Sequence, residues 1–238
     1  MKKLFLGCCF LVFGFLSFAQ FKADKIKWTA DGSSMYEKEK NSITKMNLKT
    51  GQQTVLVPAD VLKANGKTIN VADFEVSNND QLVLIFTNTA RVWRYNTRGD
   101  YWYYHIPTKR LQQIGKDRLA QSLLYAKISP DGELAAYVSE NNLYVEELAS
   151  GKSKALTSTN NTKKLINGTF DWVYEEEFGC RDGFRWSADR NSIAYWQVDA
   201  NQIKDYYMLN TPDGNYSKVI PVEYPKVGEQ PSPVKIGV

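Results

Sequence analysis

The sequence is poor in the residues from which most catalytic centres are built. Its 238 residues include three cysteines and one histidine, His105, and no Gly-x-Ser-x-Gly elbow occurs. The chain therefore lacks the nucleophile and base that a serine hydrolase brings together. His105 follows a run of four aromatic residues at the end of a strand-like segment, which favours a structural or surface role. Neither metal-ligand spacing nor a phosphate-binding loop is present, so we expect no cofactor and no metal.

A block of charge of one sign is also missing. The net charge of +4 comes from interspersed lysine and arginine, so we expect no nucleic-acid partner. With 43% hydrophobic and 24% charged residues, the composition is that of an ordinary globular protein, which argues against disorder. A chain of this length can bury a substantial core.

The amino terminus has the pattern of a bacterial-type secretory signal peptide. Lys2 and Lys3 precede an apolar run at residues 4–18, and Ser17-Phe18-Ala19 fits a signal peptidase site. The run is shorter than the roughly 20 residues of a spanning helix, although a retained anchor is the alternative. We predict a signal at 1–19, export to the periplasm or the medium, and no membrane span in the mature chain. Of the cysteines, only Cys180 would then remain, as a free thiol.

Four similar turns recur, each leading into an apolar or aromatic strand. They begin at Thr29, Ser77, Ser129 and Ser187, so they lie 48, 52 and 58 residues apart. A second strand-like run follows each turn, at residues 42–46, 101–104, 142–145 and 205–208. Repeats of this period, each with a turn and two or more strands, are typical of propeller blades. The sequence predicts an all-β fold, a partial β-propeller of about four blades.

Three consecutive glutamates, Glu175, Glu176 and Glu177, lie between aromatic residues in the stretch from Asp171 to Phe178. Carboxylates in such surroundings call for a cationic partner. On a helical turn, adjacent residues lie roughly 100° apart, so two carboxylates can converge on one small cation. A primary ammonium, with three donors and a charge, suits such a pair. The alternative is an acidic surface turn.

The stretch from Asp171 to Glu177, which runs Asp-Trp-Val-Tyr-Glu-Glu-Glu, closely resembles a known motif. It is similar to the double-glutamate motif of the dipeptidyl peptidase IV branch of the prolyl oligopeptidase family of serine peptidases. Residues 93–94, 184–187 and 224–228 also resemble this family, and the resemblance extends from about residue 28 to the last residue.

The resemblance implies a site as well as a fold. It places the motif on a short helical insertion in a blade of an eight-bladed propeller, where Glu176 and Glu177 hold the free amino terminus of a peptide. It also implies that Arg94 lies near them and contacts the substrate backbone; a surface arginine is the alternative. We expect Trp93 and Trp172 to lie in the blade core; a platform for the substrate is the alternative. Residues 20–238 would then be the N-terminal part of the propeller.

By this resemblance the chain is the propeller fragment of a secreted serine dipeptidyl peptidase, which releases X-Pro or X-Ala dipeptides. The α/β-hydrolase domain with the catalytic triad is absent from the 238 residues, so the chain alone should be inactive. A propeller-type protein that binds peptide amino termini without cutting them is the alternative. The resemblance further implies a homodimer, formed through an arm in the region of residues 206–227.

Overall fold

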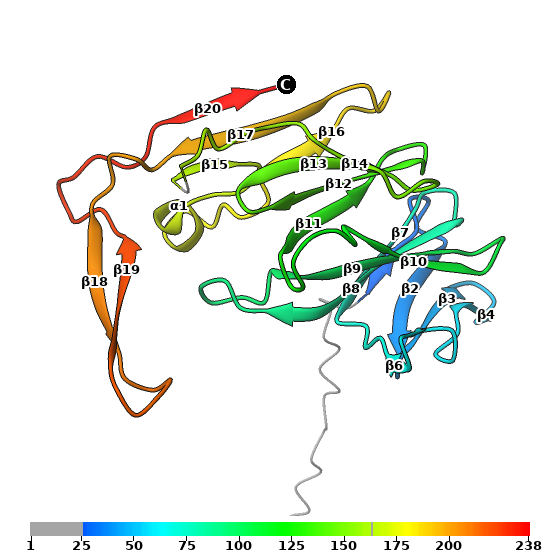
Figure 1. Cartoon of the computed structure of the whole chain (residues 1–238). Coiled ribbons are helices and arrows are strands. Elements are labelled where there is room, and N and C mark those ends of the chain that lie inside the picture. The colour runs from blue at the N-terminus through cyan, green and yellow to red at the C-terminus, as the bar shows by residue number, and fades with distance from the viewer. Residues whose placement is uncertain (1–25, 163) are drawn as a thin grey trace, which may run out of the picture.

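The computed structural model describes residues 26–162 and 164–238 (Figure 1). Across these residues the chain forms strands β1 to β20 and one short helix, α1. The prediction of a nearly all-β chain with a short helical insertion is confirmed. The signal predicted at 1–19 lies outside the described residues. Within the described ranges, no helix is both long and apolar enough to cross a membrane.

Antiparallel sheets follow one another along the chain (Figure 1). The first contains β1 (Lys27–Trp28), β2 (Ser34–Glu39), β3 (Ser42–Asn47) and β4 (Gln53–Val57), and a small hairpin, β5 (Lys63–Ala64) and β6 (Lys67–Thr68), follows. The second contains β7 (Asp73–Val76), β8 (Leu82–Ala90), β9 (Arg98–His105), β10 (Arg110–Ile114), β11 (Leu123–Ile128), β12 (Leu134–Ser139), β13 (Asn142–Glu147) and β14 (Ser153–Ala155). The third contains β15 (Leu165–Asn167), β16 (Phe184–Trp186), β17 (Ile193–Asp199) and β20 (Val234–Gly237).

The sheets are open, and they do not separate into four equal units. Strand β11 pairs with β9 through Leu123 and Gly99, which joins eight strands in one sheet. The fourth predicted run, residues 205–208, lies in β18 (Asp205–Asn210). This strand pairs with β19 (Lys218–Glu223) in a separate two-stranded arm. The count of about four blades therefore stays a prediction.

Apolar side chains fill the space between successive sheet layers because neighbouring residues of a strand point to opposite faces. In β8, Val83 and Ile85 pack with residues of the first sheet, whereas Leu82 and Leu84 pack against β11 and β12. Strand β12 continues the pattern, with Tyr137 in the second cluster and its neighbours in a third cluster shared with β16 and β17. Each layer thus depends on the next for its core.

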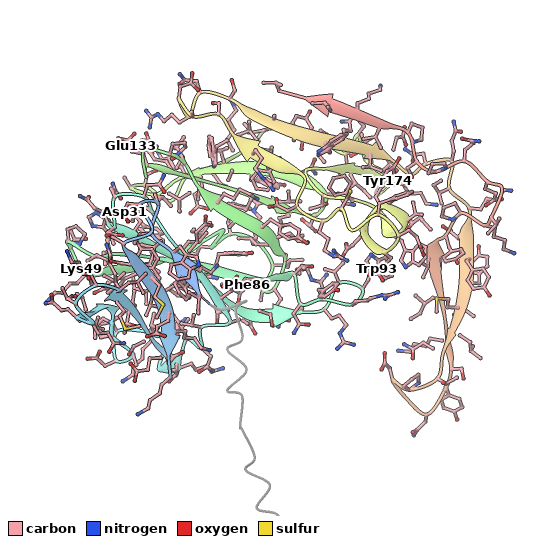
Figure 2. All side chains as sticks on the ribbon, turned by 180° about the vertical axis from the view of Figure 1, so that it is seen from behind. Asp31, Lys49, Phe86, Trp93, Glu133 and Tyr174 are labelled. Carbon is pink, nitrogen blue, oxygen red and sulfur yellow. The ribbon has the colours of Figure 1, made fainter. Side chains whose placement is uncertain are left out.

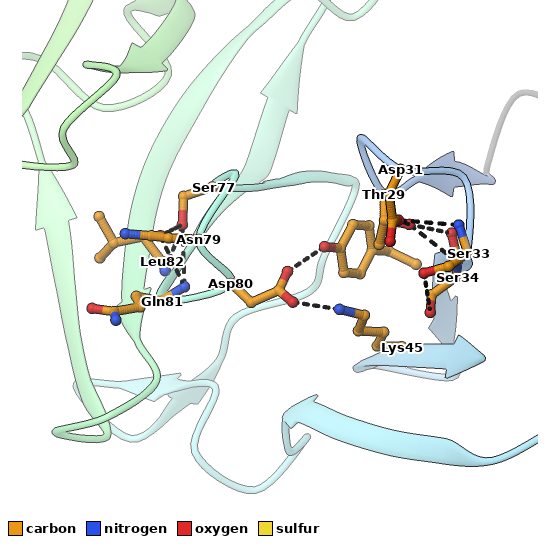
Figure 3. A network of polar contacts seen from close by, with 11 residues as sticks. Thr29, Asp31, Ser33, Ser34, Lys45, Ser77, Asn79, Asp80, Gln81 and Leu82 are labelled. Atoms are coloured by element: carbon orange, nitrogen blue, oxygen red, sulfur yellow. Dashed lines mark hydrogen bonds and ion pairs between the residues drawn. The ribbon is translucent and has the colours of Figure 1, made fainter.

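The four predicted turns have the same hydrogen bonds. The hydroxyl of the first residue donates to the side-chain oxygen two residues later, at 2.6 Å from Thr29, Ser129 and Ser187 and at 2.7 Å from Ser77. The backbone N–H of the sixth residue donates back to that hydroxyl. The fourth residue has a positive φ in every case: Gly32, Asp80, Gly132 and Arg190. Figure 3 shows the first two turns.

Where the fourth turn residue is not glycine, its side chain joins two sheets. The carboxylate of Asp80, in the second sheet, accepts hydrogen bonds from the Tyr36 hydroxyl and the Lys45 ammonium of the first (Figure 3). Arg190, in the third sheet, forms ion pairs with Asp131 and Glu133 of the second. A side chain in the left-handed region is strained relative to glycine. Contacts across the sheets offset that strain.

This arrangement predicts an order of stability among substitutions of Asp80. Both D80G and D80A lose the contacts to Tyr36 and Lys45. Only alanine also carries the strain of φ 55°, so D80A should be less stable than D80G by about 1 kcal/mol. D80N, which tolerates the left-handed region, should fall between D80G and the unsubstituted protein. Thermal unfolding measures the order, and an apparent Tm of D80A at or above that of D80G would contradict it.

Candidate functional site

The acidic motif lies on an excursion from the inner edge of the third sheet (Figure 1). The strand leaves at Gly168, whose N–H donates to the Trp196 carbonyl at 2.8 Å, and resumes at Gly183, whose carbonyl accepts from the Trp196 N–H at 2.9 Å. Two glycines thus face one residue of β17, as in a greatly enlarged β-bulge. A Cβ on Gly183 would lie 2.9 Å from the backbone of Gly168, so the close approach requires glycine.

Within the excursion, the motif folds as helix α1 (Trp172–Glu176). Five residues are too few for a helix to be stable alone, so contacts must hold it. Asp171 caps it by accepting from the Tyr174 N–H at 3.1 Å, and its other oxygen accepts from the Ser232 hydroxyl at 2.5 Å. The Tyr174 hydroxyl donates to the Ser232 carbonyl at 2.9 Å. The helix is therefore tied to the segment that leads into β20.

Arg94 comes from a different excursion, the loop between β8 and β9. Its Nε forms an ion pair with Oε2 of Glu176. The Glu176 side chain is only 3% exposed, whereas that of Arg94 is 72% exposed. The second oxygen of Glu176 is buried and has no hydrogen-bond partner among the described residues. The structure thus brings two of the three predicted site residues into contact.

Glu177, the third predicted residue, is the C-cap of α1 and is exposed. Its carboxylate makes no hydrogen bond or ion pair with any described residue. It follows Glu176 directly along the chain, at the exposed C-terminal end of α1. Its part in a shared site remains a prediction.

Glu175 and Arg181 form a second ion pair beside the first, and sequence reasoning gave neither residue a role. Oε1 of Glu175 lies 3.6 Å from Nε of Arg181, and the Glu175 side chain is buried. Burial raises the pKa of Glu175, Arg181 lowers it, and the neighbouring Glu176 raises it again. A basic residue shortly after an acidic run was the one signal in the sequence for this pair.

The expected placement of two tryptophans is wrong. Trp93 is 39% exposed in the β8–β9 loop, and Trp172 lies on α1, with its ring centroid 4.4 Å from that of Tyr224. Both belong to excursions that leave the sheets, so neither reaches a blade core. Figure 2 shows Trp93 and Tyr174 on the two neighbouring excursions.

Among the described residues, the remaining reactive side chains do not gather into a centre. His105 contacts the Thr108 hydroxyl at 2.7 Å in the turn after β9, and Cys180 is a free thiol. Across the described ranges, no three His, Cys, Asp or Glu residues are placed to hold a metal ion.

Comparison with known proteins identifies the family. The family model of the dipeptidyl peptidase IV (DPP IV) N-terminal region matches residues 77–238. The chain belongs to this family. It is similar to dipeptidyl peptidase 4 of Sus scrofa, with 28% identity over 90% of the chain and 28% of the relative, and to prolyl endopeptidase FAP of Mus musculus, with 25% identity over 88% of the chain and 27% of the relative.

Solved structures agree with this assignment. The crystal structure of Porphyromonas gingivalis dipeptidyl peptidase 4 is 25% identical, has a TM-score of 0.81, and matches 89% of this chain and 30% of that one. A Bacteroides ovatus structure, 17% identical with a TM-score of 0.58, covers 89% of this chain and 27% of its own and shows the fold alone. The chain thus spans less than a third of the length of the relatives that it matches.

The tether of α1 predicts that Asp171 stabilises this DPP IV-family site. D171A removes the helix cap and leaves the buried Ser232 hydroxyl without its acceptor, which should reduce stability by about 2 kcal/mol. S232A removes the side-chain bond but keeps the cap, so its effect should be smaller. Calorimetry of the protein measures both effects. Equal apparent Tm values for D171A and the unsubstituted protein would show that the tether is not needed.

Proposed function

We propose that this chain is the recognition part of a serine-type dipeptidyl peptidase, in which Glu176 and Glu177 hold the free amino terminus of a peptide and Arg94 contacts the peptide backbone. The contact between Arg94 and Glu176 supports this most strongly, because it joins two separate excursions at one acidic position. Membership of the DPP IV family supports the peptidase class.

The charges of the site suit one ammonium. A peptide amino terminus has a pKa near 8, so it is mostly charged at neutral pH. Glu175, Glu176 and Glu177 carry three negative charges when ionised, and Arg94 and Arg181 carry two positive ones. One substrate ammonium balances the one negative charge that remains. A peptide with a blocked amino terminus, or an internal segment of a longer peptide, brings no ammonium and leaves the carboxylates without a balancing charge. The site therefore favours peptides that bind through a free amino terminus.

Cleavage itself requires residues that this chain does not contain. We propose that the nucleophile, base and orienting acid come from an α/β-hydrolase domain elsewhere in the full-length protein, and that X-Pro and X-Ala dipeptides are released. The signal peptide predicted at 1–19 supports export, and so a role in the periplasm or outside the cell.

Substitution of the carboxylates tests the proposal. In the full-length protein, E176Q and E177Q should each lower kcat/KM for a Gly-Pro chromogenic substrate roughly 10- to 100-fold, because each removes a charge-assisted bond to the ammonium. The preference for a free over an N-acetylated dipeptide, measured as competing inhibitors, should shrink in parallel.

Arg91 provides the matched control, since it is exposed at the start of the same loop and makes no ion pair with a described residue. R91A should leave kcat/KM unchanged, whereas R94A should reduce it. If E176Q, E177Q and R94A all behave like R91A, the proposed site is refuted. Tight binding of free peptides without any turnover would instead favour the non-catalytic peptide-binding protein.

We also propose that the full-length protein is a homodimer, formed through the arm of β18 and β19. The arm projects from the sheets (Figure 1), and β18 pairs only with β19 in the described structure. Its apolar side chains are open to solvent: Tyr207 is 69% exposed, Leu209 64% and Val219 63%. An apolar surface of this kind on a projecting hairpin is typical of a protein interface.

A charge on the arm should therefore break the dimer. L209D places a carboxylate in the proposed interface, which should shift the full-length protein from dimer to monomer in analytical ultracentrifugation. Leu119, 70% exposed in the turn after β10, provides the control, and L119D should leave the mass unchanged. A dimer that persists in L209D and V219D would place the interface elsewhere.

A further inference from the structure

Arg181 contacts Tyr95 and Glu175, which are next to Arg94 and Glu176 in the chain. Its guanidinium carbon lies 4.5 Å from the ring centroid of Tyr95, the residue after Arg94. Its Nε lies 3.6 Å from Oε1 of Glu175, the residue before Glu176. One side chain thus spans the two excursions at the place where they meet.

The surroundings of Arg181 show that this bridge is made by charge and stacking. Nε of Arg181 and Oε1 of Glu175 are both buried, and neither has a hydrogen-bond partner among residues 26–162 and 164–238. The Arg181 side chain is 27% exposed and that of Glu175 7%. At 3.6 Å the two groups attract each other without a direct hydrogen bond, so their attraction depends on where Arg181 is held.

Arg181 is itself fixed to the helix side of the site. Its Nη1 donates to the Gly179 carbonyl at 3.3 Å, and the N–H of the preceding Cys180 donates to the Tyr174 carbonyl at 2.9 Å. The β8–β9 loop has less support of its own. Within it, the Val92 N–H donates to the Tyr95 carbonyl at 3.0 Å, while the Arg94 side chain is largely exposed. The stack on Tyr95 therefore connects a lightly supported loop to a fixed point.

We propose that Arg181 is a positioning residue of the amino-terminus site. By stacking on Tyr95 it holds the β8–β9 loop against α1, so that Arg94 reaches Glu176. By pairing with Glu175 it balances a buried charge that would otherwise repel Glu176. This inference rests on the proposed function. A planar guanidinium can stack and form an ion pair at the same time, which the compact ammonium of lysine does less well.

Kinetics of the full-length protein with a Gly-Pro chromogenic substrate test the proposal. R181M and Y95L should each raise KM roughly 10- to 100-fold while kcat changes less than about two-fold. Each substitution lets Arg94 move away from Glu176, which weakens binding of the substrate amino terminus, but it leaves the reacting groups untouched. R181K keeps a charge near Glu175 and should give an intermediate KM. Arg185, which pairs with Asp182 at 2.9 Å and does not contact the loop, provides the control, and R185M should leave KM unchanged.

The double variant E175Q/R181M separates positioning from charge. It removes the carboxylate that R181M leaves unpaired, so the apparent Tm should recover, but the stack on Tyr95 is still missing and KM should stay high. Full recovery of KM in this variant would overturn the positioning role.

A comparison with E176Q distinguishes this inference from the proposed function. If E176Q raises KM while R181M and Y95L do not, the amino-terminus site stands and the role of Arg181 is wrong. If E176Q and R94A leave KM unchanged, both proposals are wrong. Should R181M fail to fold, R181K and Y95L give the same decision.

Discussion

The ion pair between Arg94 and Glu176 joins two parts of the chain that leave the sheets separately. One is the loop between β8 and β9, and the other is the excursion that begins after β15. Neither segment has a strand partner at the contact, so only side chains determine how the two meet. The burial of Glu176 makes this contact important, because a carboxylate that is only 3% exposed has lost its hydration and needs a cationic partner far more than an exposed carboxylate does.

The sheets provide the frame that allows two such segments to meet. Their cores are shared between successive layers, and the repeated turns fix where each strand begins. Asp80 and Arg190 then connect neighbouring layers at equivalent turn positions, although each carries the strain of a positive φ. The relative placement of β8 and β15, and therefore of the two excursions, follows from packing and turn chemistry that lie far from the acidic motif.

Features encoded by local chemistry could be predicted from the sequence. Each of the four turns could be located because it begins with a hydroxyl residue and has a carboxylate or amide two residues later. Features that depend on the path of a loop could not. The pairing of β9 with β11 and the stacking of Arg181 on Tyr95 join residues far apart in the sequence. The exposure of Trp93 depends in the same way on the direction of its loop. No periodicity encodes such contacts, because side-chain reach and loop direction decide them.

The pair of glycines at the base of the acidic excursion also affects how this part of the fold can change. Gly168 and Gly183 together oppose Trp196, so the registers of β15 and β16 on β17 are set by their own pairs. Insertions or deletions between residues 169 and 182 would therefore alter the reach of the carboxylates without shifting a strand. The sheet tolerates a replaceable segment at this point, so the position of the carboxylates can change in related chains while the scaffold stays intact.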